Sequence, residues 1–142
     1  MKTNSLKMFS FFSVLILCLL CACSGNSRRA FLGISGASDY QTITPEAAYQ
    51  KMKELSNFVL LDVRTTAEFE ERHIAGAILI PATDLERRAA TELRRKNAVI
   101  LVYCRTGARA SNAARILVGN GYTQVFNMGG IMNWPFETVS RN

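Results

Sequence analysis

The clearest chemical signal in the sequence is a cysteine followed at once by a short loop that favours an anion. After Cys104 the chain reads Arg105, Thr106, Gly107, Ala108 and Arg109. Where such a loop turns into the start of a helix, its backbone N–H groups point inward and act together with the helix dipole, which stabilises a thiolate. We therefore expect Cys104 to be a thiolate nucleophile rather than a small buried structural side chain.

Individual residues of the loop have distinct roles in this prediction. Gly107 allows a backbone conformation closed to other residues and leaves the pocket uncrowded. Arg109 closes the loop and offers a fork of N–H donors to an oxyanion such as a sulfonate, phosphate or arsenate. Arg105 is explained equally well as a solvated loop residue and as a second positive charge for the ligand.

A buried strand and a helix are expected on the two sides of this loop. Residues 98–103 are almost entirely apolar, as in parallel strands that are covered on both faces. After the loop, apolar residues recur at helical spacing from Ala110 to Leu117, and the helix is expected to end near Gly119. Cys104 would then lie at the carboxyl end of a strand, where parallel sheets bind ligands.

The rest of the chain alternates between the same two kinds of element. Further strands are expected at residues 58–63, 77–80 and 125–126. Helices are expected at residues 45–55, after a capping box from Thr65 to Glu68, and from Thr83, where Thr83 and Glu86 repeat the capping spacing. This alternation predicts an α/β fold with a central parallel sheet flanked by helices on both faces.

Composition is that of one compact domain. The chain has 142 residues, 49% of them hydrophobic, and 17 basic against 11 acidic residues give a net charge of +6. Nine glycines and three prolines exclude collagen-like and low-complexity classes. No basic run with interleaved aromatic residues predicts nucleic-acid binding, and no His/Cys cluster or glycine-rich phosphate motif predicts a metal or nucleotide cofactor.

The first residues are typical of an exported bacterial protein. Lys2 and Lys7 precede an uncharged, largely apolar run from Met8 to Ala22, whereas a membrane-spanning helix usually needs ~20 apolar residues. The run ends in Leu-Cys-Ala-Cys-Ser, which resembles the lipobox of bacterial lipoproteins with Cys23 as the lipidated residue. An uncleaved membrane anchor is the alternative interpretation.

This segment divides the chain into three predicted parts. We expect a lipoprotein-type signal peptide at 1–22, a lipid-anchored flexible linker at 23–41 and a folded domain at 42–142. The protein would be an exported lipoprotein. It would lie on a periplasm-facing membrane, which is the outer membrane if the cell is Gram-negative, or on the outer face of the cell membrane. Cys104 would be the single cysteine of the folded body, so no disulfide can form within it.

Several motifs occur in order around the cysteine loop. They are Leu61-Asp62-Val63-Arg64, Glu68-Phe69, His73-Ile74-Ala75-Gly76-Ala77, Ile80-Pro81, the loop from Cys104 to Ser111, Gly121-Tyr122 and Gly129-Gly130-Ile131 with Asn133-Trp134. From residue 42 to residue 136 the pattern resembles a single-domain rhodanese. The resemblance implies a rhodanese-like central parallel sheet flanked by helices and a Cys104 that accepts a sulfane sulfur as a persulfide.

The resemblance also favours sulfur over oxyanion chemistry. Phosphatases and arsenate reductases of related fold use a loop one residue longer, whereas six residues run from Cys104 through Arg109. We therefore expect a thiosulfate sulfurtransferase that moves a sulfane sulfur to cyanide or a thiol. The alternatives are a persulfide carrier or redox sensor that serves a protein partner, and an oxyanion enzyme. The expected partners are small sulfur-containing anions, thiol acceptors, a membrane reached through the lipid anchor, and in the carrier alternative a protein acceptor.

Other residues near the motifs are expected to be structural. Asp62 at a strand end should accept backbone N–H bonds, and Arg64 should pair with Glu68. The resemblance places His73 in a structural turn, not in a catalytic position. Trp134 is expected to fill the core.

Overall fold

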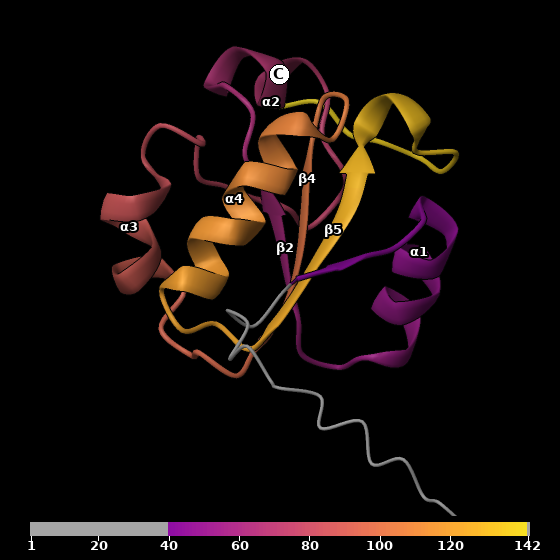
Figure 1. The fold of residues 1–142 in the computed structure, drawn as a ribbon. Helices are drawn as coiled ribbons and strands as arrows, with labels where there is room; N and C mark the ends of the chain where they lie inside the picture. Colours follow the sequence, from indigo (N-terminus) through magenta and orange to yellow (C-terminus); the bar gives the residue numbers. More distant parts are fainter. Residues whose placement is uncertain (1–39, 142) are drawn as a thin grey trace, which may run out of the picture. The chain divides into compact units, whose positions relative to one another are not determined.

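A five-stranded parallel sheet forms the centre of the computed structural model, which describes residues 40–141. The strands are β1 (Gln41–Thr42), β2 (Val59–Asp62), β3 (Ile78–Leu79), β4 (Val99–Cys104) and β5 (Gln124–Gly130). The helices are α1 (Pro45–Glu54), α2 (Thr66–Glu71), α3 (Leu85–Glu92) and α4 (Ala108–Gly119), and the short 3-10 helix η1 (Ile131–Asn133) follows β5. The sheet order is β1-β5-β4-β2-β3, so β4 is its central strand (Figure 1).

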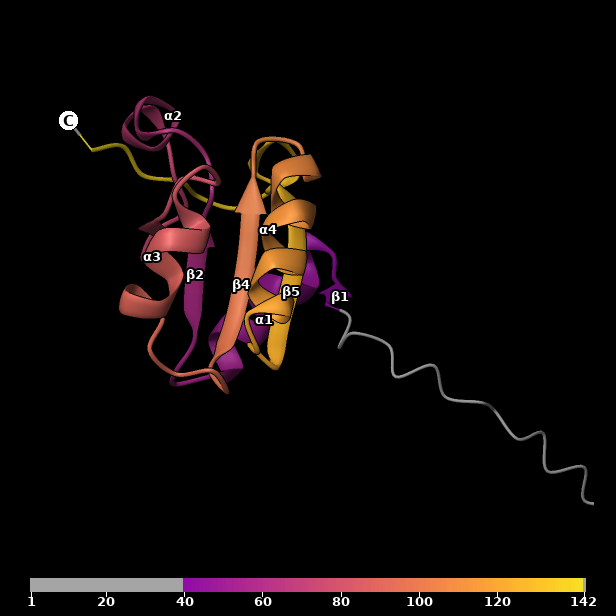
Figure 2. The same cartoon turned by 60° about the vertical axis from the view of Figure 1, so that its left-hand side comes forward.

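Helices cover both faces of this sheet. α3 and α4 pack on one face, where Val102 of β4 is buried in a cluster that includes Leu85 and Leu117. α1 packs on the other face, where the neighbouring Leu101 is buried with Ala48 (Figures 1 and 2). Consecutive residues of β4 therefore face two separate apolar cores, which explains why this strand is apolar throughout. The predicted α/β fold with a doubly covered parallel sheet is confirmed.

Two predicted helix starts are present as expected. The Thr44 side chain accepts a hydrogen bond from the Ala47 N–H at 3.2 Å, with Pro45 in the first turn of α1. At the start of α2, Thr65 and Glu68 form the reciprocal capping box. Each side chain satisfies a backbone N–H that the helix itself leaves without a partner.

The predicted capping of α3 by Thr83 is wrong. The residue at the N-cap is Asp84, and its side chain makes no capping hydrogen bond. A turn closed by the Asp84 N–H and the Pro81 carbonyl, 2.8 Å apart, leads into the helix instead. The Asp84 carboxylate is directed to the helix surface, where it pairs with Arg87 at 3.2 Å.

The edge of the sheet beside β5 differs from the prediction. β5 continues from the expected residues 125–126 to Gly130, and β1 lies in parallel beside it, with Gln41 opposite Phe126. Both residues of β1 are exposed, so no apolar pattern predicts a strand there.

The predicted signal peptide, Cys23 and the linker up to residue 39 lie outside the described residues.

The strands β2, β4 and β5 run in the same direction, so their carboxyl ends meet at one edge of the sheet. Asp62, Cys104 and Gly130 are the last residues of these strands. The pairing of β4 with β5 shifts register between Val102 and Cys104, which places Cys104 opposite Gly130. The loops that leave this edge form the candidate site.

Within residues 40–141, no helix combines the length and apolarity needed to cross a bilayer.

Candidate active site

Cys104 is held at the start of a helix by the loop that follows it. Its Sγ accepts a hydrogen bond from the Gly107 N–H at 3.1 Å, and only 1% of the residue is exposed. Gly107 is the N-cap of α4 and has a φ of +111°, which side-chain-bearing residues rarely adopt. The loop therefore directs a backbone donor and the positive end of the α4 dipole at the sulfur.

The other loop residues lie around this turn. Arg105, Thr106 and Ala108 are exposed, whereas Arg109 is half-buried. The structure thus keeps together all the residues that the sequence placed in the loop. Within residues 40–141, Cys104 is the only cysteine and is a free thiol.

The end of β5 supports the loop from behind. A Cβ atom at Gly130 would lie 2.3 Å from the Arg105 carbonyl oxygen and 2.6 Å from the Thr106 Cα. The Met132 N–H donates to the same Arg105 carbonyl at 3.2 Å. Only a glycine at position 130 leaves room for this close approach. This role of Gly130 was not predicted from the sequence, although a Gly-Gly pair at a strand end is a signal of close backbone contact.

Arg109 closes the loop by binding a carboxylate from α2. Its two terminal nitrogens donate to the two carboxylate oxygens of Glu68, each at 2.8 Å. The hydrogen bond from Arg109 is the main reason that the pKa of Glu68 falls from 4.5 to about 2. Hydrogen bonding to Glu68 raises the pKa of Arg109, and the charge of a Cys104 thiolate acts in the same direction. Arg109 is therefore a cation that is fixed in place beside the sulfur.

The predicted pairing of Arg64 with Glu68 is wrong. Arg64 pairs with Asp62, with its Nε 3.0 Å from Oδ1 and its Nη2 2.7 Å from Oδ2. Both side chains are buried, with exposures of 4% and 0%, and buried charges in proteins are paired. The predicted capture of a backbone N–H by Asp62 is confirmed, because its Oδ1 accepts from the Arg64 N–H at 2.9 Å.

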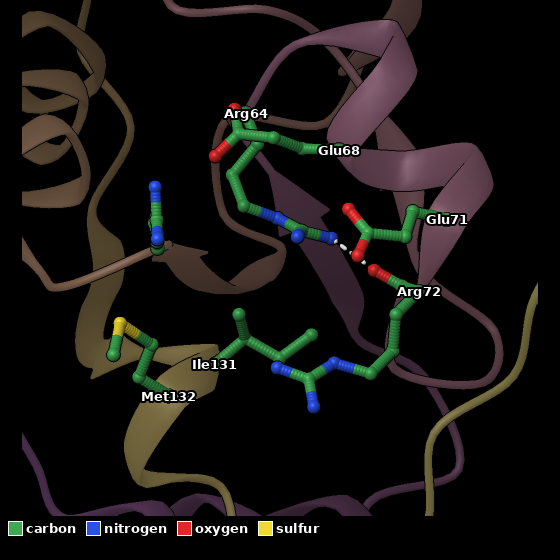
Figure 3. Close-up of a pocket in the computed structure, with 7 residues that line it drawn as sticks. Arg64, Glu68, Glu71, Arg72, Ile131 and Met132 are labelled. Atoms are coloured by element: carbon green, nitrogen blue, oxygen red, sulfur yellow. Dashed lines mark hydrogen bonds between the residues drawn. The ribbon is translucent and has the colours of Figure 1, made fainter.

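A cavity of about 260 Å³ opens beside the loop. Its lining residues are Arg64, Glu68, Glu71, Arg72, Arg105, Ile131 and Met132. Figure 3 shows that Glu71 and Arg72 come from the end of α2, whereas Ile131 and Met132 come from η1 on the other side. Arg105 joins this cavity to Cys104, the residue before it in the chain.

Comparisons with known proteins agree with this geometry. Residues 44–136 match the family model described as a rhodanese-like domain. The chain belongs to the rhodanese family. Thiosulfate sulfurtransferase PspE of Escherichia coli is 39% identical over 79 residues, which cover 56% of this chain and 76% of that protein. A sulfurtransferase of Allochromatium vinosum is 33% identical over 93 residues, which cover 65% of this chain and 85% of that protein.

Solved rhodanese structures share the fold. A structure described as a rhodanese with anions from E. coli aligns with a TM-score of 0.55 and 35% identity over 58% of this chain and 96% of that chain. A rhodanese-like domain protein from Staphylococcus aureus aligns with a TM-score of 0.64 and 26% identity, covering 72% and 99% of the two chains. This rhodanese-like chain thus has sulfurtransferase relatives, and sulfur-containing compounds are the substrates that the family indicates.

The remaining residues named from the sequence have structural surroundings. His73 Nδ1 lies 2.8 Å from the Phe69 carbonyl oxygen, its ring stacks on Phe69 at 3.8 Å, and its backbone pairs with Val139. Trp134 is 9% exposed and packs edge-on against Phe136 at 5.0 Å. These contacts account for both side chains without a chemical role.

Within residues 40–141, no group of His, Cys, Asp and Glu side chains is arranged to hold a metal ion.

Proposed function

We propose that this rhodanese-like protein is a sulfurtransferase that carries a sulfane sulfur on Cys104. The observation that carries the proposal is the Gly107 N–H at 3.1 Å from Sγ, at the N-terminus of α4. A backbone donor and a helix dipole in this position favour an anionic sulfur, whether thiolate or persulfide. The sulfurtransferase names of the relatives support the same chemistry.

The reaction needs no general acid. The Cys104 thiolate attacks the outer sulfur of thiosulfate, a bond forms between the two sulfurs, and the bond to the sulfonate sulfur breaks with release of sulfite. The enzyme then holds Cys–S–S⁻, and cyanide or a thiolate removes the outer sulfur and restores the Cys104 thiolate. Both leaving groups depart as stable anions, so proton transfer to them is unnecessary.

Two arginines serve the donor in different ways. Arg105 is exposed at the cavity, where a positive charge attracts the dianionic donor. Arg109 is committed to Glu68 through both terminal nitrogens, so we assign it to holding the loop and placing a fixed charge beside the sulfur. Thr106, Gly107 and Ala108 contribute the backbone of the cradle.

Intact mass of the purified chain before and after thiosulfate tests the proposal. We expect a gain of about one sulfur, ~32 Da, that is absent from Cys104→Ser and is discharged by cyanide as thiocyanate. A folded, reduced protein that gains no mass would reject thiosulfate as donor, and release of phosphate from aryl phosphates would favour the oxyanion alternative. A persulfide that forms but leaves only to a protein acceptor would favour the carrier alternative.

The proposed location rests on the sequence before the domain. The chain would be exported, lipidated at Cys23 and tethered to a membrane by the linker that follows. Incorporation of a labelled fatty acid by the full chain in bacterial cells tests this, with Cys23→Ser expected to lose the label and Cys21→Ser expected to keep it. Label retained by Cys23→Ser would reject the lipid anchor.

A further inference from the structure

Three charged side chains meet at the cavity and have no ion-pair partner among residues 40–141. Glu71, Arg72 and Arg105 line it and are exposed, and none of the ion pairs within residues 40–141 includes them. The other two charged residues of the lining differ, because Arg64 is paired with Asp62 and Glu68 with Arg109. The charges available to a ligand are therefore one negative and two positive.

Glu71 and Arg72 are consecutive residues of opposite charge, and both line the cavity. Glu71 is the last residue of α2 and Arg72 is its C-cap. Arg64 fixes this end of the helix, because its Nη2 donates to the Arg72 carbonyl at 2.6 Å. Figure 3 shows both side chains starting at the end of α2, with that of Arg72 extending toward Ile131. An α-amino acid carries its ammonium and its carboxylate on one carbon, so it can bind a carboxylate and a guanidinium that line one cavity and are not paired with each other.

The rest of the cavity fits a small organic molecule. Ile131 is buried, whereas Met132 is 60% exposed beside it, and the pair gives the charged side of the cavity an apolar counterpart. The volume of about 260 Å³ lies just under the ~300–1,000 Å³ typical of small-molecule sites. The contact of Met132 N–H with the Arg105 carbonyl at 3.2 Å joins this apolar wall to the cysteine loop.

We propose that the cavity binds the sulfur acceptor, and that this acceptor is a small thiol of the amino-acid type with both an ammonium and a carboxylate. Glu71 binds the ammonium and Arg72 the carboxylate, while Arg105 lies toward the persulfide. The acceptor thiolate attacks the outer sulfur of Cys104–S–S⁻, the bond between the two persulfide sulfurs breaks, and the acceptor leaves as its own persulfide with the Cys104 thiolate restored. This inference rests on the proposed sulfurtransferase function.

A series of four thiols tests the two charges separately. L-Cysteine carries both charges, N-acetylcysteine only the carboxylate, cysteamine only the ammonium and 2-mercaptoethanol neither. The rate of discharge of the preformed persulfide is measured with each thiol below saturation, for the unmodified chain and for Glu71→Gln and Arg72→Gln. The ratio of variant to unmodified rate within one thiol cancels the intrinsic reactivity of that thiol.

The proposal requires a crossed pattern of losses. Glu71→Gln should slow discharge about three- to fivefold with L-cysteine and cysteamine but not with the other two thiols. Arg72→Gln should slow discharge by a similar factor with L-cysteine and N-acetylcysteine only. Both factors are those expected for exposed charge pairs. Glu70→Gln on the same helix and Arg87→Gln on α3, both exposed and outside the cavity lining, should leave all four rates unchanged.

Two results would overturn this assignment in distinguishable ways. If persulfide forms and cyanide discharges it normally but the ratios are equal for all four thiols, the cavity does not select the acceptor, although the sulfurtransferase function stands. If no persulfide forms with any sulfane donor, the proposed function and this inference fail together.

Discussion

The ion pair between Glu68 and Arg109 can be removed without removing the helix cap that Glu68 also provides. Glu68 accepts from the Thr65 backbone N–H at 3.0 Å as part of the capping box, and glutamine serves at this position of the box as well as glutamate does. Glu68→Gln should therefore keep α2 but lose the charge that holds Arg109. The variant isolates the contribution of the pair to the loop.

The size of this contribution follows from the lowered pKa of Glu68. A pKa lowered from 4.5 to about 2 corresponds to about 3 kcal/mol at 1.36 kcal/mol per pH unit. The paired side chains are 24% and 37% exposed, so solvent screens them, and part of the lowering comes from Thr65. We expect Glu68→Gln to lower the free energy of unfolding by about 1 to 2 kcal/mol at pH 7.

The pH dependence has a definite sign. The folded-state pKa of Glu68 is depressed, so the stabilisation is fully present above its ordinary value of 4.5 and is lost as the pH falls toward about 2. Urea unfolding at pH 7, 4 and 3 should show the difference between the two proteins shrinking to less than half of its neutral value by about pH 3. Persulfide formation by the variant at pH 7 should also slow, because Arg109 is no longer fixed.

An exposed pair on another helix provides the matched control. Arg88 and Glu92 are four residues apart on α3 and 31% and 36% exposed, so Glu92→Gln should cost only ~0.5 kcal/mol and leave persulfide formation unchanged. A stability loss from Glu68→Gln no larger than this, or one that stays constant between pH 7 and pH 3, would refute the reasoning.

Three further predictions concern the loop and its support. Gly130→Ala should slow persulfide formation at least ~10-fold, because its Cβ would overlap the loop backbone. Gly119→Ala should leave the rate unchanged, because its Cβ would meet nothing within 4 Å. Mass spectrometry after a thiosulfate pulse measures both rates. Arg109→Ala should slow the same step and also cost about 1 to 2 kcal/mol in urea unfolding, and unchanged kinetics would remove Arg109 from the site. Asp62→Asn should cost about 3 to 5 kcal/mol, because Arg64 keeps its buried charge without a counterion; a loss below 1 kcal/mol would show that the pair is unimportant.

Features determined by neighbouring residues were predictable from the sequence. The capping box at Thr65 and the central strand at residues 98–103 agree with the structure to within one residue, because both depend on local hydrogen bonding or on a continuous apolar run. The cysteine loop was found for the same reason, since its residues are consecutive. The parallel sheet then places this loop at the carboxyl edge without further information.

Contacts between distant segments were not predictable. The distance along the chain between Glu68 and Arg109 is 41 residues, and only the sheet order places α2 beside the loop after β4. The sequence offered Arg64 as a closer partner, but burial directs Arg64 to Asp62. The role of Gly130 likewise depends on the register shift between β4 and β5. The Gly-Gly pair signals a close backbone contact, but a single sequence does not show which segment approaches it.

Both ends of α2 are tied to different parts of the sheet edge, and this separates the two halves of the proposed reaction. At its N-terminus Glu68 holds Arg109 and thus the loop around Cys104. At its C-terminus the Arg72 carbonyl is held by Arg64, which is anchored to Asp62 of β2. In the proposed reaction, sulfur uptake depends on the first contact and acceptor selection on the side chains held near the second. Because the six-residue helix is short and fixed at both ends, it holds the residues proposed for donor chemistry and those proposed for acceptor recognition at the edge of the sheet where Cys104 lies.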